Sequence, residues 1–247
     1  GNPRTHRASA LPAVPGLMLV ALGGSILVVR LLRVLNDSGR TAALLCPLFA
    51  ETDRAPRIFL GLHVALYSIF FAMIFVSIAQ PSIGLRVGNL VQTMFEKGDL
   101  QYVGDAYASE NVTLAALLTF HHNFVVATFL TTLLPSLVIP FSGLIVNLVR
   151  FGLVGMALAP SNIDTLTVFT YHSVTMAVEL EAYILASFAV FMYPVRLAQG
   201  AIRLSRKELS HAFALMASAT VAAALVLAVA AVYEAATLIL INRLLAS

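Results

Sequence analysis

The residues best suited to chemistry lie together in one apolar stretch of the chain. Residues 166–195 contain His172, Thr175 and Glu179, and positions three, four and seven apart share one face of a helix. An ionisable group at bilayer depth costs about 2.5 to 3.5 kcal/mol on insertion scales. We interpret the three residues as an intramembrane polar site, either a proton or ion relay or a polar seam to another subunit. A structural hydrogen bond within the protein is the alternative.

A second carboxylate follows two residues later. Glu181 points roughly to the opposite side of the same helix from Glu179, because successive helical positions are about 100° apart. The two carboxylates therefore cannot lie on one face, and we do not interpret them as a paired acid and base.

Two asparagines in other apolar stretches complete the predicted polar site. Asn123 follows His121 and His122 and can donate a hydrogen bond to a neighbouring helix. The two adjacent histidines point in different directions, so we predict no metal site there. Asn147 lies among small residues that permit close helix contact. These small residues include Gly143, Gly152 and Gly155.

His63 lies alone in another apolar stretch. Membrane histidines can ligate haem or chlorophyll through an imidazole nitrogen, so a cofactor- or pigment-binding subunit of an energy-transducing complex is one alternative function. A lone histidine is more often packed or hydrogen-bonded, and we therefore predict no cofactor.

The stretches that carry these residues are too apolar for a water-soluble domain. Of 247 residues, 60% are hydrophobic and 11% are charged, whereas an ordinary soluble domain is roughly a quarter charged. The excess apolar surface must face lipid. We predict an all-α polytopic transmembrane helix bundle that forms a single integral membrane domain. The expected location is the cytoplasmic membrane of a bacterium or an archaeon.

Six spans are expected from the apolar runs. The run over 112–158 exceeds twice the hydrocarbon thickness, so it must hold two helices joined by a turn, and Pro135 and Pro140 mark that turn. The six predicted spans are residues 14–35, 59–79, 112–133, 137–158, 166–195 and 213–241.

The distribution of basic residues predicts the orientation. The connections 36–57 and 196–210 fall on the same side of a six-span bundle and are rich in Arg and Lys. The positive-inside rule places that side in the cytoplasm. The connection 81–111, with mixed charge, is then outside.

Both long connections contain apolar positions at helical spacing. In 81–111 we expect a short amphipathic interfacial helix, and its residues Leu90, Val91 and Phe95 form a candidate docking surface for a partner. The second connection, 36–57, is similar but cytoplasmic. Its apolar positions are Leu44, Leu45, Leu48 and Phe49.

Soluble enzyme chemistry has no support in the sequence. The chain lacks the GxxxxGK[ST], HExxH, GxSxG and CxxC patterns, so we predict that it is not an enzyme. Its net charge of +3 is scattered over helix ends, and we therefore predict no nucleic-acid binding.

Three segments between residues 118 and 200 resemble the stage II sporulation protein M family of polytopic membrane proteins. They are Phe-His-His-Asn-Phe-Val-Val-Ala at 120–127, the Asn-and-Gly segment 143–155, and Glu-Leu-Glu-Ala-Tyr-Ile-Leu-Ala at 179–186. The resemblance implies that Glu179 matches the family's membrane carboxylate. It also implies a protein that scaffolds partners rather than one that catalyses a reaction.

The sequence is compatible with three functions. We expect a non-enzymatic membrane scaffold or subunit of a larger complex, with lipid and other membrane or extracytoplasmic protein subunits as its partners. A permease or transporter component with a buried site at His172 and Glu179 is the second, and the cofactor-binding subunit is the third.

Overall fold

The computed structural model describes the backbone of residues 13–39, 42–159 and 163–246. It describes side chains over the same ranges apart from those of residues 13, 163–172, 242 and 244–246. The described chain is helical throughout and contains no strand. The predicted all-α fold class is therefore confirmed.

The helices follow one another with short connections. They are α2 (Ala13–Asp37), α3 (Ala42–Arg54), α4 (Pro56–Ala79), α5 (Pro81–Lys97), α6 (Gln101–Ala108), α7 (Val112–Phe120), the π-helix η1 (His121–Leu133), α8 (Leu134–Ser136), α9 (Ser142–Ala157), α10 (Ile163–Ile202) and α11 (Arg206–Ala246).

Five stretches of helix are long and apolar enough to cross a membrane. They are Val14–Asp37, Pro56–Ala79, Val112–Ser136, Ser173–Ile202 and Arg206–Ile241. These stretches overlap five of the six predicted spans. The sixth, predicted at 137–158, corresponds to α9, an apolar helix of 16 residues. At 1.5 Å per residue α9 is about 24 Å long, shorter than the hydrocarbon core of about 30 Å.

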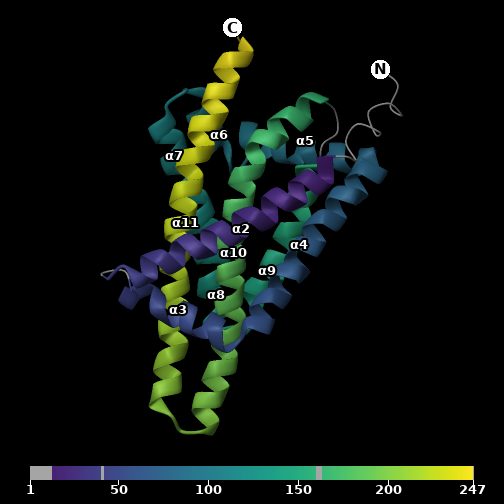
Figure 1. Ribbon diagram of the computed structural model, residues 1–247. Coiled ribbons are helices and arrows are strands. Elements are labelled where there is room, and N and C mark those ends of the chain that lie inside the picture. The colour runs from purple at the N-terminus through teal and green to yellow at the C-terminus, as the bar shows by residue number, and fades with distance from the viewer. Residues whose placement is uncertain (1–12, 40–41, 160–162, 247) are drawn as a thin grey trace.

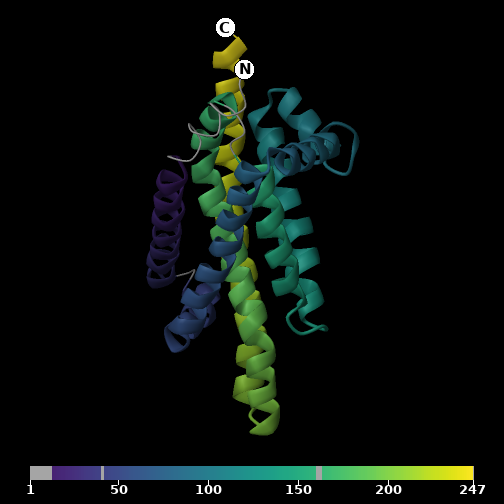
Figure 2. The ribbon, with the colours of Figure 1, turned by 90° about the vertical axis from the view of Figure 1, so that its right-hand side faces the viewer.

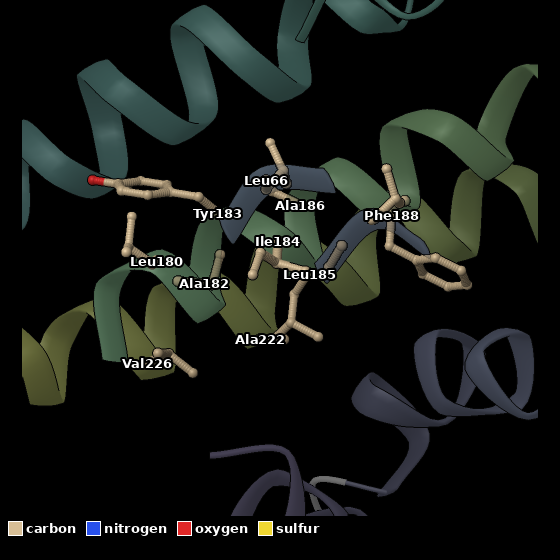
Figure 3. Close-up of a cluster of buried hydrophobic side chains, with 14 of the residues drawn as sticks. Leu66, Leu180, Ala182, Tyr183, Ile184, Leu185, Ala186, Phe188, Ala222 and Val226 are labelled. Carbon is tan, nitrogen blue, oxygen red and sulfur yellow. The ribbon is translucent and has the colours of Figure 1, made fainter. Parts of the chain in front are cut away.

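A long antiparallel hairpin of α10 and α11 forms the axis of the molecule, and the other helices pack around it (Figures 1 and 2). Figure 3 shows apolar side chains of α10 packed between neighbouring helices. The labelled residues are Leu180, Ala182, Tyr183, Ile184, Leu185, Ala186 and Phe188 of α10, Leu66 of α4, and Ala222 and Val226 of α11. Only 28% of the apolar part of each outer span, α2 and α4, is buried, which suits contact with lipid.

The hairpin is longer than the sequence indicates. The connection predicted over 196–210 is almost entirely helical, and only residues 203–205 separate α10 from α11. Pro194 lies inside α10 without ending it. Each helix has about 40 residues and is about 60 Å long, so the hairpin extends well beyond one membrane thickness.

Two close backbone contacts fix the position of α9. A Cβ at Gly143 would lie 2.2 Å from the carbonyl oxygen of Thr132, and one at Gly155 would lie 2.3 Å from the carbonyl oxygen of Phe70. Both positions therefore require glycine. A Cβ at Gly152 would meet only side-chain atoms at 3.6 Å or more, so this glycine is not required by packing. The turn before α9 holds Pro140, as expected, whereas Pro135 lies in the short helix α8 before that turn.

The short amphipathic helices lie at opposite ends of the bundle. Helix α3 lies toward the end that carries the α10–α11 turn, whereas α5 and α6 lie at the other end (Figures 1 and 2). Leu45, Leu48 and Phe49 of α3 are buried in the main core, and Leu44 is exposed. Helix α5 has no fully buried residue, which is typical of a helix lying at an interface.

Candidate functional site

A π-helix positions the first polar residue of the site. In η1 the hydroxyl of Thr128 donates to the carbonyl of Asn123 over 2.7 Å, and that of Thr132 donates to the carbonyl of Ala127 over 3.0 Å. Both bonds join residues five apart, which matches the wide turn of a π-helix. Such turns are uncommon and occur often at functional sites.

Asn123 and two carboxylic residues of the hairpin, Glu179 and Glu234, come together near the α5–α6 end. Asn123 Nδ2 donates to Oε1 of Glu179 over 2.6 Å, and the Glu179 side chain also shares a hydrogen bond with that of Glu234 on α11. An ionised carboxylate only accepts hydrogen bonds. The shared bond therefore requires a proton on at least one of the two carboxyl groups.

These residues line a cavity of about 330 Å³. The lining comes from α5, α6, α7, η1, α9, α10 and α11 and is largely apolar. Its polar members are Tyr107, Thr119, His122, Asn123, Arg150, Glu179, Tyr183 and Glu234. A mostly apolar pocket with a few convergent polar groups is the usual form of a small-molecule site.

Arg150 of α9 forms part of the cavity wall and holds three helices together. Its Nη2 donates to the carbonyl of Ala127 over 2.7 Å and to Oγ1 of Thr131 over 3.0 Å. Its Nη1 donates to Asn147 and to Thr132. The guanidinium carbon lies 4.8 Å from the ring centroid of Tyr183 on α10. Among the described residues no acidic side chain forms an ion pair with Arg150.

The outer rim of the cavity comes from α5 and α6. Val91 and Phe95 line the cavity, whereas Leu90 is 60% exposed on the other side of α5. The predicted docking surface is therefore divided between the cavity and the outside. The hydroxyl groups of Tyr107 on α6 and Thr119 on α7 lie 3.2 Å apart. Burial raises the pKa of the Tyr107 phenol, so this group stays neutral.

The structure brings together some of the predicted polar residues and separates others. Glu179 and Asn123 are directly bonded. Asn147 accepts a hydrogen bond from Arg150 through Oδ1, and Nδ2 of Asn147 donates to Oγ of Ser187 over 2.8 Å. Thr175 is buried, and its hydroxyl has no hydrogen-bond partner among the described residues. The side chain of His172 lies outside the described residues.

Among the members of the site that were not predicted from the sequence, Glu234 and Arg150 carry the charged groups. Glu234 is the one acidic residue in the apolar run 209–241, and the cost of a lone carboxylate at bilayer depth was the signal that could have identified it. Arg150 lies within the predicted span 137–158 and inside α9, and the cost of a charge at bilayer depth was the signal here too.

Glu181 faces a different group of residues. Its Oε2 lies 3.0 Å from Nε2 of His63 on α4, and Nδ1 of His63 lies 2.9 Å from the carbonyl oxygen of Phe59. Close by, the hydroxyls of Ser25 and Tyr67 lie 2.8 Å apart. Both ring nitrogens of His63 are therefore engaged. Glu179 and Glu181 contact different helices, as their spacing indicates.

A third polar cluster lies at the end that carries α3. The buried Glu51 accepts from Nε and Nη2 of Arg196 over 3.0 and 2.7 Å, and its other oxygen lies 2.8 Å from Nε2 of His211. This cluster joins α3 to both helices of the hairpin. Its compact bonding favours a structural role.

Metal binding has no support in the described part of the chain, where no group of three or more His, Cys, Asp or Glu residues is arranged to hold an ion. His121 is exposed, and Nδ1 of His122 lies 3.1 Å from the hydroxyl of Tyr102.

Comparison with protein-family models, curated proteins and solved structures finds no match for this chain.

Proposed function

We propose that this membrane protein is a component of a transport system and that the cavity around Glu179 is its substrate site. The observation that carries the proposal is the bonding of Glu179 to Asn123 and Glu234 inside a cavity of about 330 Å³. Carboxyl groups within spans are costly and mark ion, proton or substrate pathways. Glu179 and Glu234 share a proton. Release of this proton when substrate binds can couple substrate movement to proton movement.

The proposal is tested in liposomes that contain the purified protein and an entrapped pH-sensitive dye. Small organic cations, anions and neutral molecules are added one at a time while a pH gradient is imposed. We expect at least one chemical class to drive proton movement with wild-type protein, and we expect Glu179→Gln to abolish it.

Glu181→Gln is the matched control, because it removes a carboxylate from the same helix on the face that contacts His63. It should retain the flux. Equal flux with wild type and Glu179→Gln, or no flux with any class, contradicts the proposal.

A second function, a scaffold in a larger complex, is favoured by the turn of the α10–α11 hairpin. Ile202 and Leu204 are 84% and 90% exposed there, beside Arg203 and Arg206. Exposed apolar residues next to basic ones suit contact with another protein, and the resemblance to the stage II sporulation protein M family implies the same role. Cross-linking from position 204 in intact cells tests it. A chain that remains uncross-linked counts against a partner at this turn.

The cofactor-binding alternative is less well supported by the contacts of His63. Haem or chlorophyll ligation needs a free imidazole nitrogen, and both nitrogens of His63 have oxygen neighbours at 2.9 to 3.2 Å. An absorption spectrum of the purified protein tests this alternative, since a Soret or chlorophyll band would revive it.

A further inference from the structure

The chemistry of the cavity wall points to one class of ligand, and this inference rests on the proposed transport function. The question is which charge the cavity accepts. Arg150 is the arginine of the lining, which also holds His122, and four N–H···O contacts already occupy the two Nη atoms of Arg150. The face of its guanidinium lies against Tyr183. An anion would have to displace these contacts, so Arg150 has few free donors with which to bind an anion.

The carboxyl end of the cavity has the opposite character. A carboxylate has about four lone-pair sites, and Glu179 accepts one hydrogen bond from Asn123 and shares one with Glu234. Glu179 therefore has acceptor capacity left over. A protonated amine brings three N–H donors and a positive charge, so it complements this end of the cavity.

Of the charged or titratable neighbours of Glu179 in the described cavity lining, Glu234, Tyr107 and Tyr183 suit a cation. Arg150 is the exception, and its Nη donors are already engaged. Glu234 adds a second carboxyl group, while Tyr107 and Tyr183 offer hydroxyl groups and aromatic rings, which attract cations. The charged or titratable neighbours are Glu234 of α11, His122 of η1, Arg150 of α9, Tyr107 of α6 and Tyr183 of α10.

The remaining wall is apolar and reaches the lipid-facing surface. Leu153 lines the cavity and is 48% exposed, on the same side of α9 as the exposed Ile145 and Val149. Phe95 of α5 lines it as well and is also partly exposed. The mouth of the cavity therefore lies where α5 meets the lipid-facing side of α9. A ligand with an apolar body can enter there from the outer part of the bilayer.

We propose that the cavity binds a small amphiphilic primary amine, whose ammonium group takes the place of the proton shared by Glu179 and Glu234. The apolar body lies against α5, α6 and α9. The step balances, because R–NH3+ enters a carboxyl–carboxylate pair and one proton leaves to water, so that an ammonium lies between two carboxylates. The proton and the amine compete for the same oxygens, and binding weakens as the pH falls.

The experiment uses 3-phenylpropylammonium as the probe, with 3-phenylpropanol and 3-phenylpropanoate as its neutral and anionic counterparts. Binding to the full chain in lipid nanodiscs is measured by calorimetry in two buffers of different ionisation enthalpy, which gives the number of protons released. The chain has no Trp, so Phe95→Trp places a single fluorescent reporter at the mouth of the cavity. Empty nanodiscs correct for partition of the probe into lipid.

We expect saturable binding of the ammonium with release of about one proton, and weaker binding of the alcohol without proton release. Glu179→Gln should weaken ammonium binding at least about tenfold, the loss of one charge-assisted hydrogen bond. Glu110→Gln, which alters an exposed carboxylate paired with Arg243, should leave it unchanged. Val91→Phe fills the cavity from the interfacial helix α5 and should weaken binding with both carboxyl groups intact.

Tighter binding of the carboxylate probe, or equal ammonium affinity in wild type and Glu179→Gln, overturns the inference. So does an absence of proton release. The outcome is separable from that of the transport assay. Ammonium binding with proton release but without flux supports this ligand class and removes the transport proposal. Flux of an anion that depends on Glu179 supports transport and removes this ligand class.

Discussion

Asn123 Nδ2 lies 2.6 Å from Oε1 of Glu179 and joins the π-helix η1 to α10 across 56 positions of sequence. The contact places an amide donor on a carboxyl group that also bonds to Glu234. Helices η1, α10 and α11 thus meet at one polar cluster, beside α5 and α6 in the cavity lining. A membrane protein retains such a cluster at a cost, and this cost is why we assign it a functional role.

The arrangement of the helices predicts which positions share a side of the membrane. Cys46 is the sole cysteine and is exposed on α3, toward the end that carries Leu204. In intact cells we expect an impermeant maleimide to leave Cys46 unlabelled. In a Cys46→Ser background, a cysteine at 204 should also stay unlabelled, whereas one at Leu90 should react. Labelling of 204 and 90 from the same side would contradict this topology.

Gly155→Ala should destabilise the bundle, because the new methyl group would lie 2.3 Å from the Phe70 carbonyl oxygen and force α4 and α9 apart. We expect a loss of about 1–3 kcal/mol, as for overpacked cores, read as a lower melting temperature in detergent. Gly152→Ala is the matched control on the same helix, where the methyl group has room. If the two variants melt together, the close α4–α9 contact is wrong.

Two ion pairs that involve α3 should differ strongly in their contribution to stability. Arg196→Ala leaves the buried Glu51 without its arginine, and breaking a buried pair costs about 3–5 kcal/mol. Arg33→Ala removes an exposed pair with Asp53, which costs about 0–1 kcal/mol. Urea or thermal unfolding in detergent measures both. Similar losses of stability for the two variants would mean that Glu51 does not form a buried ion pair with Arg196.

Arg150→Lys keeps the positive charge but loses the planar fork that reaches η1. Lysine cannot bond simultaneously to the Ala127 carbonyl, Thr131 and Asn147 as Arg150 does. We expect a loss of about 1–3 kcal/mol and faster proteolysis within η1. Unchanged stability would show that the guanidinium does not brace the π-helix.

Lipid makes part of this fold readable from sequence, since a span must be long, apolar and helical. That rule indicated the long helices and the turn that holds Pro140. The same rule singled out Glu179 and Asn123, because polar groups at bilayer depth are conspicuous. Their direct contact could not be predicted, since it depends on how η1 packs against α10.

Other features depend on tertiary contacts that leave no local pattern. The charged residues between 196 and 210 suggested a loop, yet Arg196 bonds to Gln199 and Glu51 and lies within a continuous helix. The π-helical register of η1 is fixed by hydrogen bonds five residues apart, which hydrophobic periodicity does not reveal. Glu234 joins the site only because α11 passes beside α10 there (Figure 1).

We propose that the Glu179 carboxyl group carries the proton exchange in the substrate cavity. This proposal is tested most directly by the initial rate of substrate-driven proton movement in liposomes of wild type, Glu179→Gln and Glu181→Gln, at equal amounts of folded protein. We expect proton movement with wild type and Glu181→Gln, and a loss of at least about nine-tenths of the rate with Glu179→Gln. Equal rates in wild type and Glu179→Gln would contradict it.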